Sequence, residues 1–185
     1  MVELLVSLAI TAMLLTATMV AIDASFKAYA GSAEEAATAA STRLVTHRLL
    51  TLVRTSTAHG PLLPDATTDP PVTYDSTTSL ITSHYLELID TNGDLIRIEY
   101  DADTEQLMMT RTGGGTTQTE PILAGVTSAT FYAKRRLDRS GVFVLERGTM
   151  DLTIMPGADA TLSLESGTSR AIRVIASTMP RRLEN

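Results

Sequence analysis

The chain begins MVELLVSLAITAMLLTATMVAI over residues 1–22, and the interpretation of everything after it depends on this apolar run. From Leu4 to Ile22 the run has nineteen residues without a charge, a proline or a glycine. About twenty apolar residues are needed for a helix to cross a bilayer. Glu3 stands at the start of the run, and a carboxylate in hydrocarbon costs on the order of a few kcal/mol. We therefore expect a membrane-spanning helix in which Glu3 has a partner.

The order of residues at this start is similar to a known pattern. Met-Val-Glu-Leu-Leu-Val-Ser-Leu-Ala-Ile resembles the prepilin-type segment shared by type IV pilins and the pseudopilins of type II secretion. Val2 to Ile10 match that segment, with Glu3 on the family's glutamate. The resemblance implies a subunit that lies in the inner membrane before assembly. It also implies that Glu3, once buried in a filament, pairs with the free amino terminus of a neighbouring subunit.

Chains of that family carry a short basic leader, a glycine cleavage site and two further mature residues ahead of this pattern. Met1 falls where the family usually has Leu, so we expect the true start to lie upstream, with prepilin peptidase as a partner in that case. A cleaved secretory signal would instead have a basic start and a shorter apolar core. A plain signal anchor would carry Lys or Arg on its cytoplasmic side. These two alternatives and a buried core helix stay open behind the pilin-like interpretation.

The composition agrees with an exported protein. The chain has no cysteine, so it contains neither a disulfide nor a thiol nucleophile. Its net charge is −6 and it has no lysine- or arginine-rich block, so no nucleic-acid partner is indicated. Arg135-Arg136 and Arg181-Arg182 are interpreted as solvated surface.

The helical pattern continues beyond the apolar run. Residues 23–60 are rich in Ala, Leu, Glu and Arg, with Gly31 as a point where the helix could bend and Gly60-Pro61 as its stop. Residues 45–53 carry an apolar stripe at helical spacing, which predicts packing against a sheet. The stripe consists of Val45, Leu49, Leu52 and Val53.

After residue 60 the pattern changes from helix to strand. Residues 61–79 contain four prolines and are expected to form a connector loop. Residues 80–185 are expected to form an antiparallel sheet, with a hairpin turning at Asn92-Gly93 between two alternating runs. One long N-terminal helix packed on an antiparallel sheet is an α+β fold, pilin-like in outline. Further strands are expected near 106–111, 119–123, 126–135, 142–146, 150–155, 161–164 and 170–177.

This second part of the chain also has a looser resemblance. The stretch LIRIEYDADTEQLMMTRTGGG followed by EPILAGVTSATFYA is similar to the larger minor pseudopilins, the J-type subunit of type II secretion, and to the PilW-like minor pilins. The resemblance does not separate these two subfamilies.

One cation site has to be weighed. Asp90, Asn92 and Asp94 have the spacing that can begin a calcium loop. Gly93 is not where an EF-hand needs its glycine, however, and the twelfth position is Asp101, a short side chain, in place of Glu. Turn chemistry is the preferred interpretation and calcium the alternative; no other cofactor is expected.

The sequence thus predicts a filament subunit that is not an enzyme. Its expected partners are other minor pseudopilins or pilins, the major subunit and, before assembly, the inner membrane, with the globular domain outside the cytoplasm. Two other classes stay open. One is a signal-anchored binding domain of the envelope acting outside a filament, and the other is an anchored enzyme.

Overall fold

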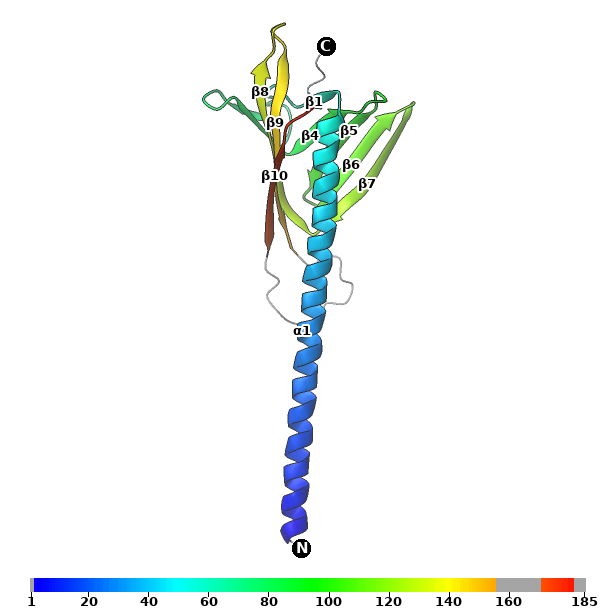
Figure 1. Ribbon diagram of the computed structural model, residues 1–185, viewed down its shortest axis with the longest axis vertical. Helices are drawn as coiled ribbons and strands as arrows, with labels where there is room; N and C mark the ends of the chain where they lie inside the picture. The colour runs from blue at the N-terminus through cyan, green and yellow to red at the C-terminus, as the bar shows by residue number, and fades with distance from the viewer. Residues whose placement is uncertain (1, 156–170, 182–185) are drawn as a thin grey trace.

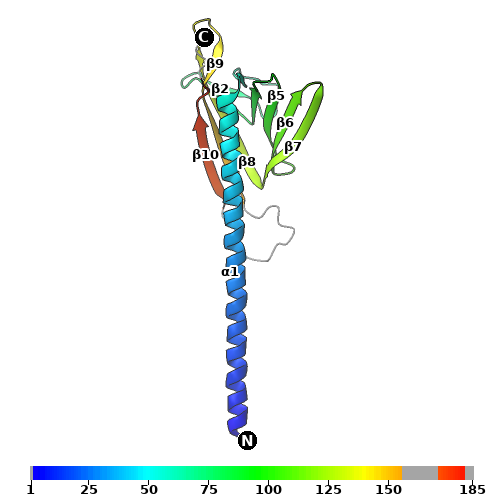
Figure 2. The same cartoon turned by 45° about the vertical axis from the view of Figure 1, so that its right-hand side comes forward.

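A single helix forms the axis of the molecule. The structure is a computed structural model that describes residues 2–155 and 171–181. Helix α1 (Val2–Thr55) has 54 residues and passes Gly31 without interruption. At 1.5 Å per residue its length is about 81 Å. Figures 1 and 2 show that its N-terminal half extends well beyond the globular domain, while its C-terminal end lies against the strands.

The helix ends earlier than residue 60, the end that the sequence suggested. Thr57 donates from its backbone N–H to the carbonyl of Ile89, and Ala58–Gly60 form strand β1, which pairs with β4. The chain therefore leaves the helix at Thr55, five residues before the Gly60-Pro61 stop signal, because a neighbouring strand supplies its hydrogen bonds.

Two five-stranded sheets, both antiparallel, make up the rest of the described domain. The first has the order β1-β4-β5-β6-β7, and the second has the order β10-β9-β8-β3-β2. The first sheet contains β4 (Tyr85–Ile89), β5 (Leu95–Asp101), β6 (Gln106–Gly113) and β7 (Thr116–Ala124) beside β1. The second contains β2 (Thr73–Asp75), β3 (Leu80–Ser83), β8 (Val126–Leu137), β9 (Phe143–Ile154) and β10 (Ile172–Thr178).

The α+β class expected from the sequence is confirmed, but the strands form two sheets where one was expected. The chain changes sheet between β1 and β2, between β3 and β4, and finally between β7 and β8 at Gly125, whose φ is 70°. This left-handed conformation is accessible to glycine at little cost. A single glycine between two strand patterns looks like an ordinary hairpin turn, so the change of sheet leaves no separate signal in the sequence.

Several strand boundaries also differ from expectation. Residues 142–146 and 150–155 belong to one strand, β9, which tolerates an irregularity opposite Lys134/Arg135. The short strand β3 was not expected. The expected strand at 161–164 lies outside the described residues.

The connector at residues 61–79 is partly ordered by the second sheet. It contains β2, which pairs with β3, and an isolated bridge between Asp65 and Val72. Val72 is buried in the core. The segment is therefore more than a surface loop, because its apolar residue fills space between the two sheets.

The core lies where the two sheets and the C-terminal part of α1 meet. Its most completely buried side chains come from all three, and each is 1% exposed or less: Leu49, Ile81, Leu88, Ile98, Leu107, Leu152, Ile154 and Val126. Because Leu49 of the helix belongs to this set, α1 forms part of the domain core and is held to it by burial of apolar surface.

Candidate functional site: the exposed half of the helix

The N-terminal half of α1 is long and apolar enough to be a membrane anchor, and a globular domain follows it. An 18-residue window has a mean hydropathy of 2.3, and none of that window is buried within the molecule. Leu4, Leu8 and Met13 are each about 70% exposed. So much contiguous apolar surface is unfavourable in water and is stable only when lipid or other apolar surface packs against it.

The hydroxyl groups in this half of the helix have hydrogen-bond partners within the helix itself. Each of five hydroxyl groups donates to a backbone carbonyl three or four residues earlier, at 2.7–3.0 Å. These are the hydroxyls of Ser7, Thr11, Thr16, Thr18 and Ser25. Hydroxyl groups bonded in this way remain satisfied in an apolar medium. The outer surface of the segment is therefore compatible with lipid or with packed helices.

Glu3 lies in the first turn of α1 and is exposed. A carboxylate there interacts favourably with the positive end of the helix dipole. Among the described residues no Lys, Arg or His nitrogen forms an ion pair with it. If the apolar half of the helix is covered, Glu3 is the one acidic group carried into the covered region, so it requires a cationic partner from outside the described chain.

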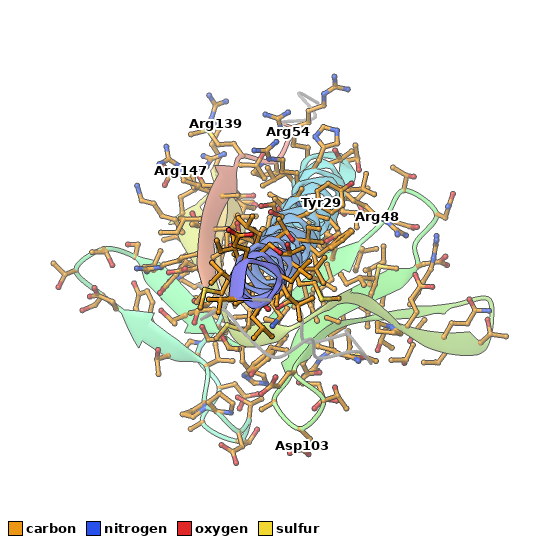
Figure 3. All side chains as sticks on the ribbon, turned by 90° about the horizontal axis from the view of Figure 1, so that it is seen from below. Tyr29, Arg48, Arg54, Asp103, Arg139 and Arg147 are labelled. Carbon is orange, nitrogen blue, oxygen red and sulfur yellow. The ribbon has the colours of Figure 1, made fainter. Side chains whose placement is uncertain are left out.

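The apolar surface ends at a recognisable boundary. Asp23 and Lys27 form an i,i+4 ion pair with an N···O distance of 3.0 Å. Phe26 and Tyr29, on the same stretch, are 71% and 76% exposed, and Figure 3 shows Tyr29 projecting from the helix. Aromatic side chains beside charged ones are enriched at the level of lipid headgroups. The sequence analysis did not single out these aromatics, although their position just after the apolar run was a usable signal.

The apolar stripe at residues 45–53 faces the sheets. Leu49 and Val53 are 1% and 4% exposed, and Val45 and Leu52 are partly buried against the same core. A gap of about 20 Å³ between helix and sheets is lined by Leu49, Val53, Phe131 and Met150, among others. It holds a single water molecule at most, so this part of α1 is a packing surface without a ligand site.

The end of the helix is tied to the last strand. The Arg54 side chain donates from Nε to the Thr178 hydroxyl at 2.9 Å. The backbone N–H of Arg181 donates to the Arg54 carbonyl at 3.1 Å. These contacts hold the segment after β10 across the end of α1.

Asp90, Asn92 and Asp94 form the turn between β4 and β5, and their carboxylates already have a cation. Asp90 Oδ1 accepts hydrogen bonds from the backbone N–H groups of Asn92 and Asp94. Arg111 donates to Asp90 Oδ2 at 2.6 Å and to Asp94 Oδ2 at 2.9 Å. Within residues 2–155 and 171–181 no group of three His, Asp or Glu side chains is arranged to hold a metal. A calcium ion at this turn would have to displace Arg111.

Arg135 corrects one expectation. Of the Arg135-Arg136 pair expected to be solvated, Arg136 is exposed but Arg135 is only 7% exposed. Its guanidinium carbon lies 3.7 Å from the centre of the Tyr74 ring and 4.0 Å from that of Phe143. It also donates from an Nη atom to the Leu62 carbonyl at 2.8 Å. Arg135 therefore fastens the connector to β8 and β9.

No family model, curated protein or solved structure matches this chain. The functional argument therefore rests on the exposed helix, on Glu3 and on the residues around them.

Proposed function

We propose that the protein is a structural subunit of a pilin-like filament, a minor pseudopilin of type II secretion or a minor pilin, and that it has no enzymatic activity. The observation that carries the proposal is the form of α1. Its apolar half is wholly exposed, yet the same unbroken helix continues into the core of the globular domain. Such a rod is suited to two environments in succession, namely lipid before assembly and the bundled helices of neighbouring subunits afterwards.

Glu3 is the assembly residue in this proposal. Desolvating a lone carboxylate is costly, whereas pairing it with a neighbour's cationic group offsets that cost. Because helices that are out of register would leave the carboxylate unpaired, the pair favours one alignment of the rods over others. The resemblance of residues 2–10 to the prepilin-type segment supplies the partner, which is the free amino terminus of the adjacent subunit.

The proposal also places the protein in the cell. It is a single-pass inner-membrane protein before assembly, with its globular domain outside the cytoplasm. In the filament the domain faces outward, at the surface or the tip, and contacts the major subunit and sibling minor subunits. No cofactor is required, because the work done is packing and alignment.

The test is a Glu3→Gln substitution in the full-length, processed protein. Glutamine keeps the shape and removes the charge, so membrane insertion is retained. Crosslinking or co-purification with sibling subunits is expected to fall strongly, because the charge pair is lost. Glu35→Gln, an equivalent change at an exposed position higher on α1, is the matched control and is expected to leave recovery unchanged.

Normal partner recovery and normal filament or secretion output for Glu3→Gln would contradict the assembly role. The better interpretation would then be a signal-anchored binding domain of the envelope that acts outside a filament.

A further inference from the structure

Arginines that form no ion pair with another described residue gather at one corner of the globular domain. Arg54 is bonded to Thr178, and in the β9–β10 ladder Thr178 lies opposite Gly148. Arg147 directly precedes Gly148 in β9. Arg181 is held against the end of α1 by its backbone hydrogen bond to Arg54. Arg136 and Arg139 follow along the β8–β9 hairpin, and Figure 3 shows Arg54, Arg139 and Arg147 on the same side of the molecule. We call Arg54, Arg136, Arg139, Arg147 and Arg181 the arginine corner; all five are exposed.

The arginine corner is distinguished by what its members lack. Of the five other arginines at the described surface, four have carboxylate partners and Arg43 on α1 has none. Arg48 binds Glu120, Arg97 binds Glu87 and Glu99, Arg111 binds Asp90 and Asp94, and Arg173 binds Asp151. None of the five corner arginines forms an ion pair within the described residues, in a chain whose net charge is −6. Glu146, close by in β9, is taken by Lys134 at 3.4 Å.

A complementary surface lies at the other end of the domain. Asp101, Asp103 and Glu105 form the turn between β5 and β6, which we call the acidic turn, and none of them forms an ion pair with a described residue. The Glu105 carbonyl accepts a hydrogen bond from Val126, the first residue of β8, whereas Arg136 lies near the last. At 3.3 Å per residue along β8, Arg136 lies about 33 Å from Val126, and Arg147, which pairs with Lys134, lies about 26 Å from it.

The two surfaces also face different ways. Seen along α1 in Figure 3, Asp103 lies on the side of the molecule opposite Arg54, Arg139 and Arg147. A molecule with complementary surfaces on opposite sides cannot satisfy both in a closed two-fold pair. It can satisfy both in a head-to-tail series, in which each copy presents its corner to the turn of the next.

We infer that the arginine corner of one copy docks against the acidic turn of a second copy of this chain. The inference rests on the proposed filament role, because in a filament parallel helices can be displaced along their axes while they hold the two domains side by side. The separation along β8 then makes the contact staggered, with the upper end of one domain meeting the lower end of its neighbour. It adds to the proposed function that the subunit occurs in at least two adjacent copies.

A second copy fits the corner better than a nucleic acid does. Single-stranded nucleic acid is held by aromatic stacking as well as by cations. The large exposed apolar residues beside the corner arginines are aliphatic, namely Leu137, Val142 and Met179, at 53–58% exposure. Phe143 is occupied by Arg135. Aliphatic side chains rimmed by arginines are typical of a protein contact.

The contact is expected to be weak in free solution and effective in the filament. Exposed ion pairs individually contribute little and are screened by salt. Packing the α1 helices of both partners into one filament raises the effective concentration of the two surfaces, which converts a weak contact into an occupied one. The contact should therefore weaken as ionic strength rises.

The test uses cysteine crosslinking in intact cells that assemble the filament, since the natural chain has no cysteine. Met179→Cys marks the arginine corner and Ala102→Cys marks the acidic turn; both positions are exposed, and neither substitution removes a charge. With a short bismaleimide, the chain carrying both cysteines should give a ladder of dimers, trimers and larger species. Each single-cysteine chain should remain monomeric.

Charge changes in the double-cysteine chain test the cause of the ladder. Arg147→Glu is expected to lower the crosslinked fraction about tenfold, since it replaces attraction by repulsion. Adding Asp103→Arg to the same chain should restore it, because the two charges are then exchanged. Arg43→Glu is the matched control: Arg43 is exposed on α1, away from the corner, and the ladder should not change.

Three results would overturn the inference. The first is a ladder that Arg147→Glu leaves unchanged, and the second is a Met179→Cys chain that crosslinks to itself. The third is a Met179→Cys chain that crosslinks only to a protein of different mass, which would make a sibling subunit the occupant. In each case Glu3-dependent recovery of sibling subunits would still stand, so failure of this inference is distinguishable from failure of the proposed function.

Discussion

Arg135 places a permanent charge inside the domain, between the rings of Tyr74 and Phe143. The guanidinium is flat and weakly hydrated, so it can be stacked where an ammonium group would be costly to bury. Its partners are Leu62 and Tyr74 of the connector and Phe143 of β9, and these two segments are far apart in the sequence. One side chain thus orders residues that carry no regular pattern of their own.

Arg135→Ala is therefore expected to destabilise the domain by about 2 kcal/mol, through loss of the stacked rings and of the bond to Leu62. The connector should also be cleaved more readily by proteases, because its attachment to β8 is lost. Thermal unfolding and limited proteolysis of the full chain in detergent measure the two effects. Arg136→Ala, one residue further on and exposed, should change stability by less than about 0.5 kcal/mol. Equal effects of both substitutions would contradict the role of Arg135 in holding the connector against β8 and β9.

His59 gives the domain a pH dependence with a defined sign. Burial lowers the pKa of His59 below its ordinary value of 6.5, although a hydrogen bond from Nε2 to the Val53 carbonyl partly opposes the shift. The folded state therefore binds a proton less readily than the unfolded state. Its contribution to stability is complete above about pH 6.5 and is lost as the pH falls through the folded pKa.

We accordingly expect the unfolding temperature to fall between pH 7.5 and pH 5, and His59→Gln to reduce that fall, because glutamine does not titrate. His47→Gln, at an exposed position on α1, is the control. If the two variants lost stability equally on acidification, His59 would not be the group responsible.

At the scale of elements, α1 belongs to two environments. Its first half presents apolar side chains outward, while residues 45–53 turn a narrow apolar stripe into the core. Leu44 and Leu49 lie only five positions apart on the same helix, yet they are 70% and 1% exposed. Leucine is therefore exposed at position 44 and buried in the core at position 49 of the same helix.

This contrast supplies a matched pair of substitutions. Leu49→Ala leaves a cavity beside Phe131 and Met150 and is expected to cost about 3 kcal/mol. Leu44→Ala removes the same atoms from an exposed position and should cost less than about 0.5 kcal/mol. Chemical denaturation of both variants measures the difference. A comparable loss for Leu44→Ala would mean that this face of α1 is covered in the folded protein.

The elements also show where sequence reasoning succeeds and where it fails. The long helix and the hairpin at Asn92-Gly93 follow from local patterns, and both are present. The pairing of β1 with β4 and of β3 with β8 joins segments that are distant in the sequence, and no local periodicity encodes it. For the candidate site, the position of Glu3 follows from the sequence. The burial of Arg135 does not, because it depends on rings brought from two other strands.

At the scale of the whole molecule, the membrane-like part and the globular part are joined only through α1. The core is formed by the sheets together with helix residues from about 45 onward. Residues before Asp23 contribute nothing to it, since they are exposed throughout the described part of that segment.

Deletion of residues 1–22 is therefore expected to leave a soluble, folded domain with the strand content seen here. Circular dichroism and size-exclusion chromatography without detergent check this. Aggregated or unfolded material would show that the apolar half of α1 is needed for folding as well as for anchoring.

The unbroken helix also fixes the angle, measured around its axis, between Glu3 at one end and the globular domain at the other. Each residue of an α-helix turns the chain by about 100° and advances it by 1.5 Å, so an uninterrupted α1 fixes the azimuth of the arginine corner relative to Glu3. One alanine inserted after Ser25 would rotate the two faces by about 100°, whereas seven, which make close to two full turns, would leave them within about 20°. The number of residues between the apolar run and the core thus determines which side of the globular domain faces a neighbour when Glu3 is paired.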